Sequence, residues 1–183
     1  MKCKKCDKEA VCSELCRGHF VDYLEKKVRK TIRQYKLFKK NDKIAVAVSG
    51  GKDSTVVLYM LHKMGYPVTG ITVDALIGNY TKKNLENLKE VCNKYDITLK
   101  ELNFREEFGH SLCYIQSIVK QKGLAYKSCT TCGVLRRYLL NKYSKEFDVL
   151  VTGHNLDDEA QCFLMNVFRN DTKVAPRQGP VTG

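Results

Sequence analysis

A short glycine-containing loop at residues 49–54 (SGGKDS) constrains the fold of this 183-residue chain more than any other feature. It follows an apolar segment, 43–48 (KIAVAV), and it precedes a segment with helical periodicity. Two adjacent glycines let the backbone turn sharply and approach a ligand without a Cβ clash. The free amides of a following helix attract phosphate, so the loop is predicted to bind a phosphorylated ligand. It lacks the GxxxxGK[ST] spacing of a Walker-A loop.

Strand-like and helix-like segments alternate along the rest of the chain. The segments that read as strands are 43–48, 68–73, 97–104 and 148–152. The segments with helical spacing are 54–64, 81–95, 111–122, 133–145 and 157–169, and an extended tail follows. This alternation predicts an α/β fold, a parallel sheet flanked by helices. Ligands of such sheets bind beyond the carboxyl ends of the strands.

The N-terminal region differs in composition from the rest. Residues 1–21 are rich in Cys and Lys and predict a small zinc-binding module, and residues 22–40 predict a basic linking helix that ends before Asn41. Residues 41–183 then form the α/β domain. The neighbouring basic helix is a candidate RNA contact.

Cys and His residues with metal-ligand spacing lie in the first 19 positions. Cys3 and Cys6 form a CxxC pair, and Cys16 and His19 form a CxxH pair, which suits tetrahedral zinc. Cys12 is an alternative ligand. A module this short cannot bury a core, so the metal would supply its folding energy.

A second CxxC pair, Cys129 and Cys132, has no partner pair nearby in the sequence. Three interpretations compete: iron-sulfur ligands, a redox or persulfide-carrying pair, and half of a second zinc site. The remaining Cys92, Cys113 and Cys162 are expected to be isolated buried thiols.

The charge balance points to a polyanionic partner. The chain has 32 Lys and Arg against 20 Asp and Glu, a net charge of +12 and an isoelectric point near 9.3. Such a surface attracts nucleic acid by counterion release. We expect no membrane partner and a cytoplasmic location, because the sequence shows no bilayer-spanning apolar run and no secretory signal.

A second glycine-containing patch, 153–160 (GHNLDDEA), follows the last predicted strand. Gly153 would allow close approach to a nucleotide. Asp157 and Asp158 stand at the start of a helix, where carboxylates are stabilised, and one of them is expected to cap it. Arg136 and Arg137 are candidate phosphate contacts.

Five motifs in register resemble one family: CxxC…CxxH, SGGKDS, CTTCGVLRRY, GHNLDDEA and RQGPV. It is the group of tRNA 2-thiouridine synthetases of the PP-loop ATP pyrophosphatase superfamily, which includes the TtuA type and the eukaryotic cytosolic wobble-uridine thiolases. The resemblance runs from Cys3 to Val181. It implies that 41–183 is a PP-loop ATP-binding catalytic domain, incomplete at its C-terminus.

The resemblance implies an ATP-dependent sulfurtransferase that adenylates the C2 oxygen of a tRNA uridine and then replaces it with sulfur. The implied catalytic residues are Asp158, with a second role near Mg²⁺, Lys52, Cys129 and Cys132. The implied ATP contacts are Ala47, Ser49, Gly50, Gly51, Lys52, Asp53, Ser54, Arg136, Gly153 and Asp158.

The resemblance also implies cofactors and partners. Zn²⁺ would be held by the N-terminal module, and Cys129 and Cys132 would be two ligands of a [4Fe-4S] cluster whose third ligand is not in this chain. Sulfur would come from a ubiquitin-like carrier or free sulfide, and the enzyme would be a homodimer.

Three alternatives remain open at the level of sequence. One is a tRNA thiolase that carries a persulfide on Cys129 and Cys132 without a cluster. The second is a PP-loop enzyme with a different nucleophile. The third is a zinc-containing nucleic-acid-binding module with a vestigial ATP loop, although the intact Lys52, Asp53, Asp157 and Asp158 argue against it.

Overall fold

The computed structural model describes residues 1–170, 179 and 181, with the side chains of 79 and 80 left out. The chain divides into two compact units, residues 1–39 with 163–183 and residues 40–162. Each unit is described by itself. No helix among the described residues is long and apolar enough to cross a bilayer.

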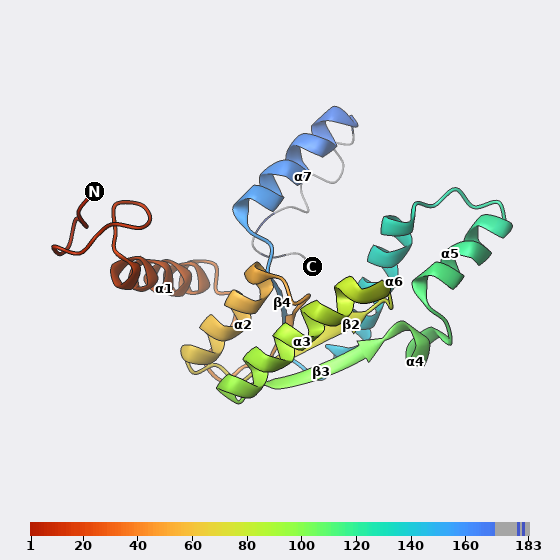
Figure 1. Cartoon of the computed structure of the whole chain (residues 1–183), viewed down its shortest axis with the longest axis horizontal. Coiled ribbons are helices and arrows are strands. Elements are labelled where there is room, and N and C mark those ends of the chain that lie inside the picture. Colours follow the sequence, from red (N-terminus) through yellow and green to blue (C-terminus); the bar gives the residue numbers. More distant parts are fainter. Residues whose placement is uncertain (171–178, 180, 182–183) are drawn as a thin grey trace. The chain divides into compact units, whose positions relative to one another are not determined.

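A four-stranded parallel sheet forms the centre of the larger unit (Figure 1). Its strands are β1 (Ile44–Ala47), β2 (Val68–Asp74), β3 (Thr98–Asn103) and β4 (Val149–Thr152). Their order is β3-β2-β1-β4, and Ile44 of β1 is in register with Val68 on one side and Val149 on the other. The predicted α/β fold with a parallel sheet flanked by helices is therefore confirmed.

Helices follow each strand of this sheet. They are α2 (Lys52–Lys63), α3 (Gly78–Tyr95), α4 (Phe104–Phe108), α5 (Leu112–Gln121), α6 (Ser128–Tyr143) and α7 (Leu156–Phe168). The short helix α4 was not expected from the sequence. Asn103 begins it, because its side chain accepts a hydrogen bond from the Glu106 N–H at 2.9 Å.

The start of α6 differs from the sequence-based prediction. The helix begins at Ser128 rather than near Gly133, so Cys129 and Cys132 lie in its first turns and not in a loop. Two other cysteine expectations were wrong: Cys113 and Cys162 are exposed, and of that group only Cys92 is buried. Cys113 follows Leu112, the buried first residue of α5, which takes the core position.

Apolar side chains from β1, β2 and β3 and from α4, α5 and α6 make one core cluster of this unit. Ala45, Ile71, Phe104 and Leu139 are fully buried within it. Cys132 packs against the same cluster from α6. Glu107 of α4 also contacts the end of α6, because it accepts hydrogen bonds from Lys142 and from the Tyr143 hydroxyl. These contacts fix α6 to the sheet.

Helix α1 (Arg17–Gln34) belongs to the smaller unit and ends earlier than predicted. Lys36 has a positive φ of 50°, and the Leu37 N–H reaches back to the Ile32 carbonyl at 3.1 Å. This hydrogen bond is the helix-ending bond of a Schellman motif. The helix also begins inside the segment predicted to be the zinc module.

Candidate functional site

The strand order creates a crevice at the carboxyl end of the sheet. The chain leaves β1 towards β2 and later returns on the other side of β1 as β4. Loops that leave the carboxyl ends of β1 and β4 therefore diverge at this point, which is where ligands bind in open α/β sheets. Both glycine-containing patches of the sequence lie at this point.

A cavity of about 490 Å³ opens at this crevice, a volume within the usual range for ligand sites. Strands β1, β2 and β4 and helices α2, α3, α6 and α7 contribute to its wall. The predicted site residues among its lining are Ala47, Ser49, Gly51, Asp53, Ser54, Arg136, Arg137, Gly153 and Asp158.

The phosphate loop is held by its own hydroxyl groups. The Ser49 N–H donates to the Ser54 hydroxyl at 3.2 Å, and the two hydroxyl oxygens lie 3.3 Å apart. Gly51 precedes the first turn of α2 and supplies no side-chain cap. The amides of that turn are therefore open to an anionic ligand, as a helix N-terminus that binds phosphate requires.

Gly50 has a packing role rather than a lining role. Its φ is +77°, and a Cβ atom at this position would lie 2.4 Å from the Asn84 carbonyl oxygen of α3. Both the left-handed backbone and the close approach require glycine. Gly50 thus sets the loop against α3 beside the cavity.

Gly153 joins the two patches of the site. A Cβ atom on it would lie 2.5 Å from the Cα atom of Ser54. The loop after β4 therefore lies directly on the first turn of α2. A side chain at Gly153 would separate the two loops that form the cavity wall.

Arg136 lines this cavity and carries a buried donor that is unsatisfied among the described residues. Its Nε atom is buried and has no hydrogen-bond partner among the residues that the structure describes. Leaving a buried charged donor unpaired costs considerable free energy. A phosphate oxygen of a bound nucleotide would supply the missing acceptor, and the neighbouring Arg137 also lines the cavity.

Asp158 is held in a reciprocal cap at the start of α7. Its Oδ2 accepts a hydrogen bond from the Asn155 N–H at 2.8 Å, and the Asn155 side chain accepts from the Asp158 N–H at 3.1 Å. This capping box fixes the carboxylate at the cavity edge. Asp157, by contrast, is not among the lining residues.

Two of the predicted ATP contacts stand apart from the lining. Lys52 is exposed at the first position of α2, and Gly50 faces α3. Sequence reasoning missed Asp74 and His154, although both follow or end parallel strands and so belong to the ligand edge of the sheet. It also missed Thr81 and Asn84 of α3, because nothing in the sequence said which side of α3 faces the cavity.

Cys129 and Cys132 lie three residues apart in α6, on neighbouring sides of the helix. Cys129 is exposed and Cys132 is half-buried against the core. At 100° per residue, Cys129 shares the side of Arg136, two turns or about 10 Å along the helix. No third ligand residue completes a group with this pair among the described residues, and neither cysteine lines the cavity.

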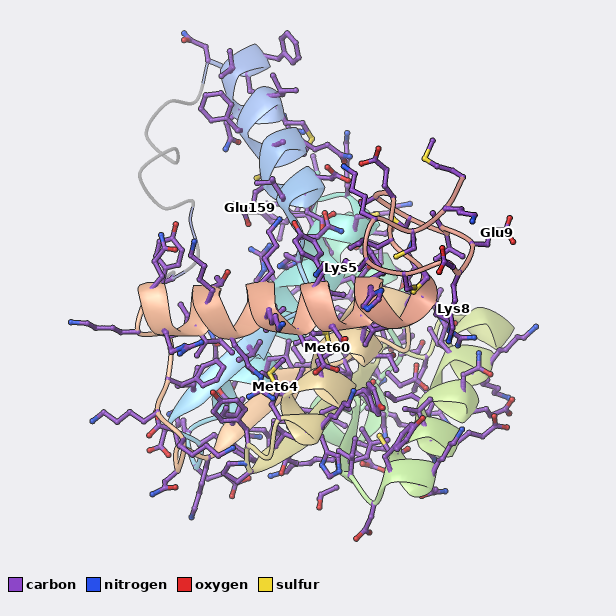
Figure 2. The ribbon with its side chains drawn as sticks, turned by 90° about the vertical axis from the view of Figure 1, so that its left-hand side faces the viewer. Lys5, Lys8, Glu9, Met60, Met64 and Glu159 are labelled. Atoms are coloured by element: carbon purple, nitrogen blue, oxygen red, sulfur yellow. The ribbon has the colours of Figure 1, made fainter. Side chains whose placement is uncertain are left out.

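The N-terminal donors converge in the smaller unit. Figure 2 labels Lys5, Lys8 and Glu9 in the N-terminal segment that carries these donors. The donor atoms of Cys3, Cys6, Cys16 and His19 all lie within 4.8 Å of one another. His19 Nδ1 is 3.4 Å from the Cys3 and Cys16 sulfurs and 3.5 Å from Cys6 Sγ. The Cys6 and Cys16 sulfurs are 3.7 Å apart.

These distances fit the edges of a zinc tetrahedron. With metal–sulfur bonds of about 2.3 Å and metal–nitrogen bonds of about 2.0 Å, the edges are about 3.8 Å between sulfurs and about 3.5 Å from sulfur to nitrogen. Burial acts to raise the pKa of the Cys3 thiol, but hydrogen bonds from the Cys16 and Lys5 backbones outweigh it and lower the pKa to about 6. Cys12 is exposed and outside this group.

The chain is similar in sequence to known proteins. Residues 22–175 match the family described as PP-loop domain. The chain is 37% identical over 189 residues to tRNA-5-methyluridine(54) 2-sulfurtransferase of Pyrococcus horikoshii, covering 99% of this chain and 59% of that protein. It is 38% identical over 166 residues to cytoplasmic tRNA 2-thiolation protein 1 of Drosophila mojavensis, covering 86% of this chain and 47% of that protein.

A solved structure is also similar over most of the chain. It is the U34-tRNA thiolase NcsA from Methanococcus maripaludis with its [4Fe-4S] cluster, at 33% identity and a TM-score of 0.81. The match covers 94% of this chain and 59% of that one. The chain thus spans about three fifths of the length of the first relatives that it matches.

Proposed function

This chain belongs to the PP-loop family, and from that premise we propose that it is an ATP-dependent tRNA thiolase. The reaction would replace the C2 oxygen of a tRNA uridine with sulfur. The relatives that span its length carry names of tRNA 2-thiolation proteins, and these favour thiolation over PP-loop chemistry with another nucleophile. Those relatives are longer, so the activity of the whole protein is part of the proposal.

ATP would occupy the cavity at the carboxyl end of the sheet. The α2 amides and the hydroxyls of Ser49 and Ser54 would bind the phosphates. The buried Nε of Arg136 would donate a hydrogen bond to a phosphate oxygen. Lys52 would add a cation from the start of α2. The carboxylates of Asp53 and Asp158 suit Mg²⁺, which prefers oxygen ligands shared with phosphates.

The first chemical step would be adenylation. The uridine O2 attacks the α-phosphate, pyrophosphate leaves, and the base loses its N3 proton. Asp158 is proposed to accept that proton, because its carboxylate is fixed at the cavity edge by the capping box. The positive groups of the phosphate loop would stabilise the leaving pyrophosphate.

The second step would be substitution at C2. A sulfide nucleophile adds to C2, the C2–O2 bond breaks, and AMP leaves with the former base oxygen. Cys129 lies on the same side of α6 as Arg136, so the cysteine pair is proposed to hold the incoming sulfur near the activated base. A [4Fe-4S] cluster, when bound, would supply an iron that holds sulfide. The described residues offer two of its thiolates, and a further ligand would have to come from elsewhere.

The other assignments complete the proposal. Residues 1–21 would bind structural Zn²⁺ through Cys3, Cys6, Cys16 and His19. Residues 41–183 would form the catalytic domain, and residues 22–40 would form the helix that links it to the zinc module. We also propose a cytoplasmic homodimer that receives sulfur from a ubiquitin-like carrier or from free sulfide.

One observation carries this proposal: Arg136, which lines a cavity bordered by both glycine patches, has a buried Nε without a hydrogen-bond partner among the described residues. Its test is an anaerobic reaction of the protein with ATP, sulfide and tRNA, followed by nucleoside mass spectrometry. We expect 2-thiouridine to form only when ATP is present. ATP turnover without any thiolated nucleoside would reject the function.

A further inference from the structure

The exposed side of α1 carries a dense group of cations. We propose that this cationic face binds the phosphate backbone of tRNA. We define the cationic face as Lys26, Lys27, Arg29, Lys30 and Arg33, all of which are exposed. The inference rests on the proposed function, because it names the surface by which that substrate is held.

The cationic face lies opposite the apolar side of the helix. At 100° per residue, Leu24, Val28 and Ile32 share one side, and the cations centre on the other. Ile32 is 5% exposed, and Leu24 and Val28 are half-buried. The apolar side is thus used for packing, and the cations are presented to solvent.

These cations have no acidic partners within the described part of the chain. Other lysines of the chain do form ion pairs with carboxylates, for example Lys4 with Glu14 and Lys89 with Glu101. None of the five side chains of the cationic face forms such a pair with a described residue. Residues 26–36 contain six cations and no acid.

The spacing of these charges disfavours the isolated helix. Lys26 and Lys30, and likewise Arg29 and Arg33, stand four residues apart, where like charges repel one another across one turn. Only Arg33 lies in the last turn, where the helix dipole favours a cation. The arrangement therefore lowers helix stability, and a polyanion that binds along the face would remove the repulsion.

Two further features suit RNA. Tyr23 is 43% exposed beside this face, with the Lys27 ammonium 5.8 Å from its ring centroid, so an aromatic surface adjoins the cations. The metal-ligand group includes His19 in the first turn of α1 and Cys16 just before it. Bound metal would therefore fix the amino end of the helix that presents the charges. An anionic membrane fits less well, because lipid insertion would require the apolar side that packing already buries.

The test compares two triple variants with equal charge loss. K26Q/K30Q/R33Q removes three charges from the cationic face. The control K43Q/K94Q/K145Q removes three exposed charges near the amino ends of the sheet strands, away from the cavity. Affinity for tRNA is measured by fluorescence anisotropy over a range of salt concentrations, with zinc content and ATP affinity as checks on folding.

We expect K26Q/K30Q/R33Q to weaken tRNA binding at least tenfold and to reduce the slope of log K against log salt by about 2. The control variant should change affinity less than threefold. Equal affinity and equal slope in the two variants would overturn the inference while leaving thiolation intact. Vesicles of phosphatidylserine that bind through this face, with tRNA binding unchanged, would also overturn it. If the unaltered protein binds tRNA and never thiolates it, the proposed function fails and the docking surface stands.

Discussion

Gly153 and Ser54 approach so closely that a Cβ atom on Gly153 would lie 2.5 Å from the Ser54 Cα atom. Gly153 lies in the loop after β4, and Ser54 lies in the first turn of α2, about 100 positions earlier in the sequence. Both residues line the cavity, and their contact closes one wall of it. The proposed nucleotide site therefore depends on a backbone-to-backbone contact that only glycine permits at this position.

Substitution of this glycine tests that dependence. Gly153→Ala should lower stability by about 1–3 kcal/mol, as overpacking does, and weaken ATP binding at least tenfold, because the first turn of α2 must move. Calorimetry and thermal unfolding measure the two effects. Gly18→Ala is the matched control, since nothing lies within 4 Å of its added Cβ. Equal behaviour of the two variants would show that the contact is unimportant.

Alanine variants of Gly50 and Gly109 distinguish the effect of backbone strain from that of steric clash. Gly50→Ala should be more destabilising than Gly109→Ala, although the two residues have nearly equal φ values of +77° and +76°. Only at Gly50 would the new Cβ meet a neighbouring backbone, the Asn84 carbonyl oxygen at 2.4 Å. Thermal unfolding of both variants measures the difference. If Gly109→Ala is equally destabilised, strain alone accounts for the glycine.

Arg136 provides a test in which affinity and stability change in opposite directions. Arg136→Gln should weaken ATP binding about 10- to 100-fold and leave the ligand-free melting temperature unchanged or raised, because it removes an unpaired buried donor. ATP should raise the melting temperature of the unaltered protein and of the exposed control Arg105→Gln. Normal ATP affinity in Arg136→Gln would contradict the assignment.

Metal content tests the N-terminal group. The unaltered protein should hold one Zn²⁺ in this module, and His19→Ala should lose it together with helicity in α1, because the metal supplies folding energy for so short a segment. Elemental analysis and circular dichroism give both readouts. Cys12→Ala should keep its zinc, since Cys12 is exposed and outside the group. Zinc lost equally from both variants would refute the ligand set.

The sequence was most informative where the pattern and the chemistry were local. The strand, loop and helix around SGGKDS and the spacing of Cys3, Cys6, Cys16 and His19 each depend on residues close together in the chain. Contacts between segments far apart in the sequence could not be predicted. The approach of Gly153 to Ser54 and the side of α3 that brings Thr81 and Asn84 to the cavity depend on how distant segments pack.

Two helix boundaries differ from the sequence-based predictions. Helix α6 begins at Ser128 and not near Gly133, because Cys132 packs against the core and stabilises the early turns. Helix α1 ends at Gln34 because Lys36 takes a left-handed conformation that the sequence of polar and basic residues did not reveal. Asp158 both caps α7 and lines the cavity, and this combination could be recognised only in the structure.

The most direct test of the account follows the base oxygen. A tRNA carrying ¹⁸O at uridine C2 is incubated anaerobically with the protein, ATP and sulfide, and the released AMP is analysed by mass spectrometry. Adenylation followed by substitution predicts one ¹⁸O in the phosphate of AMP for each 2-thiouridine formed, together with one pyrophosphate. AMP whose new oxygen comes from water, or release of ADP and orthophosphate, would contradict the account.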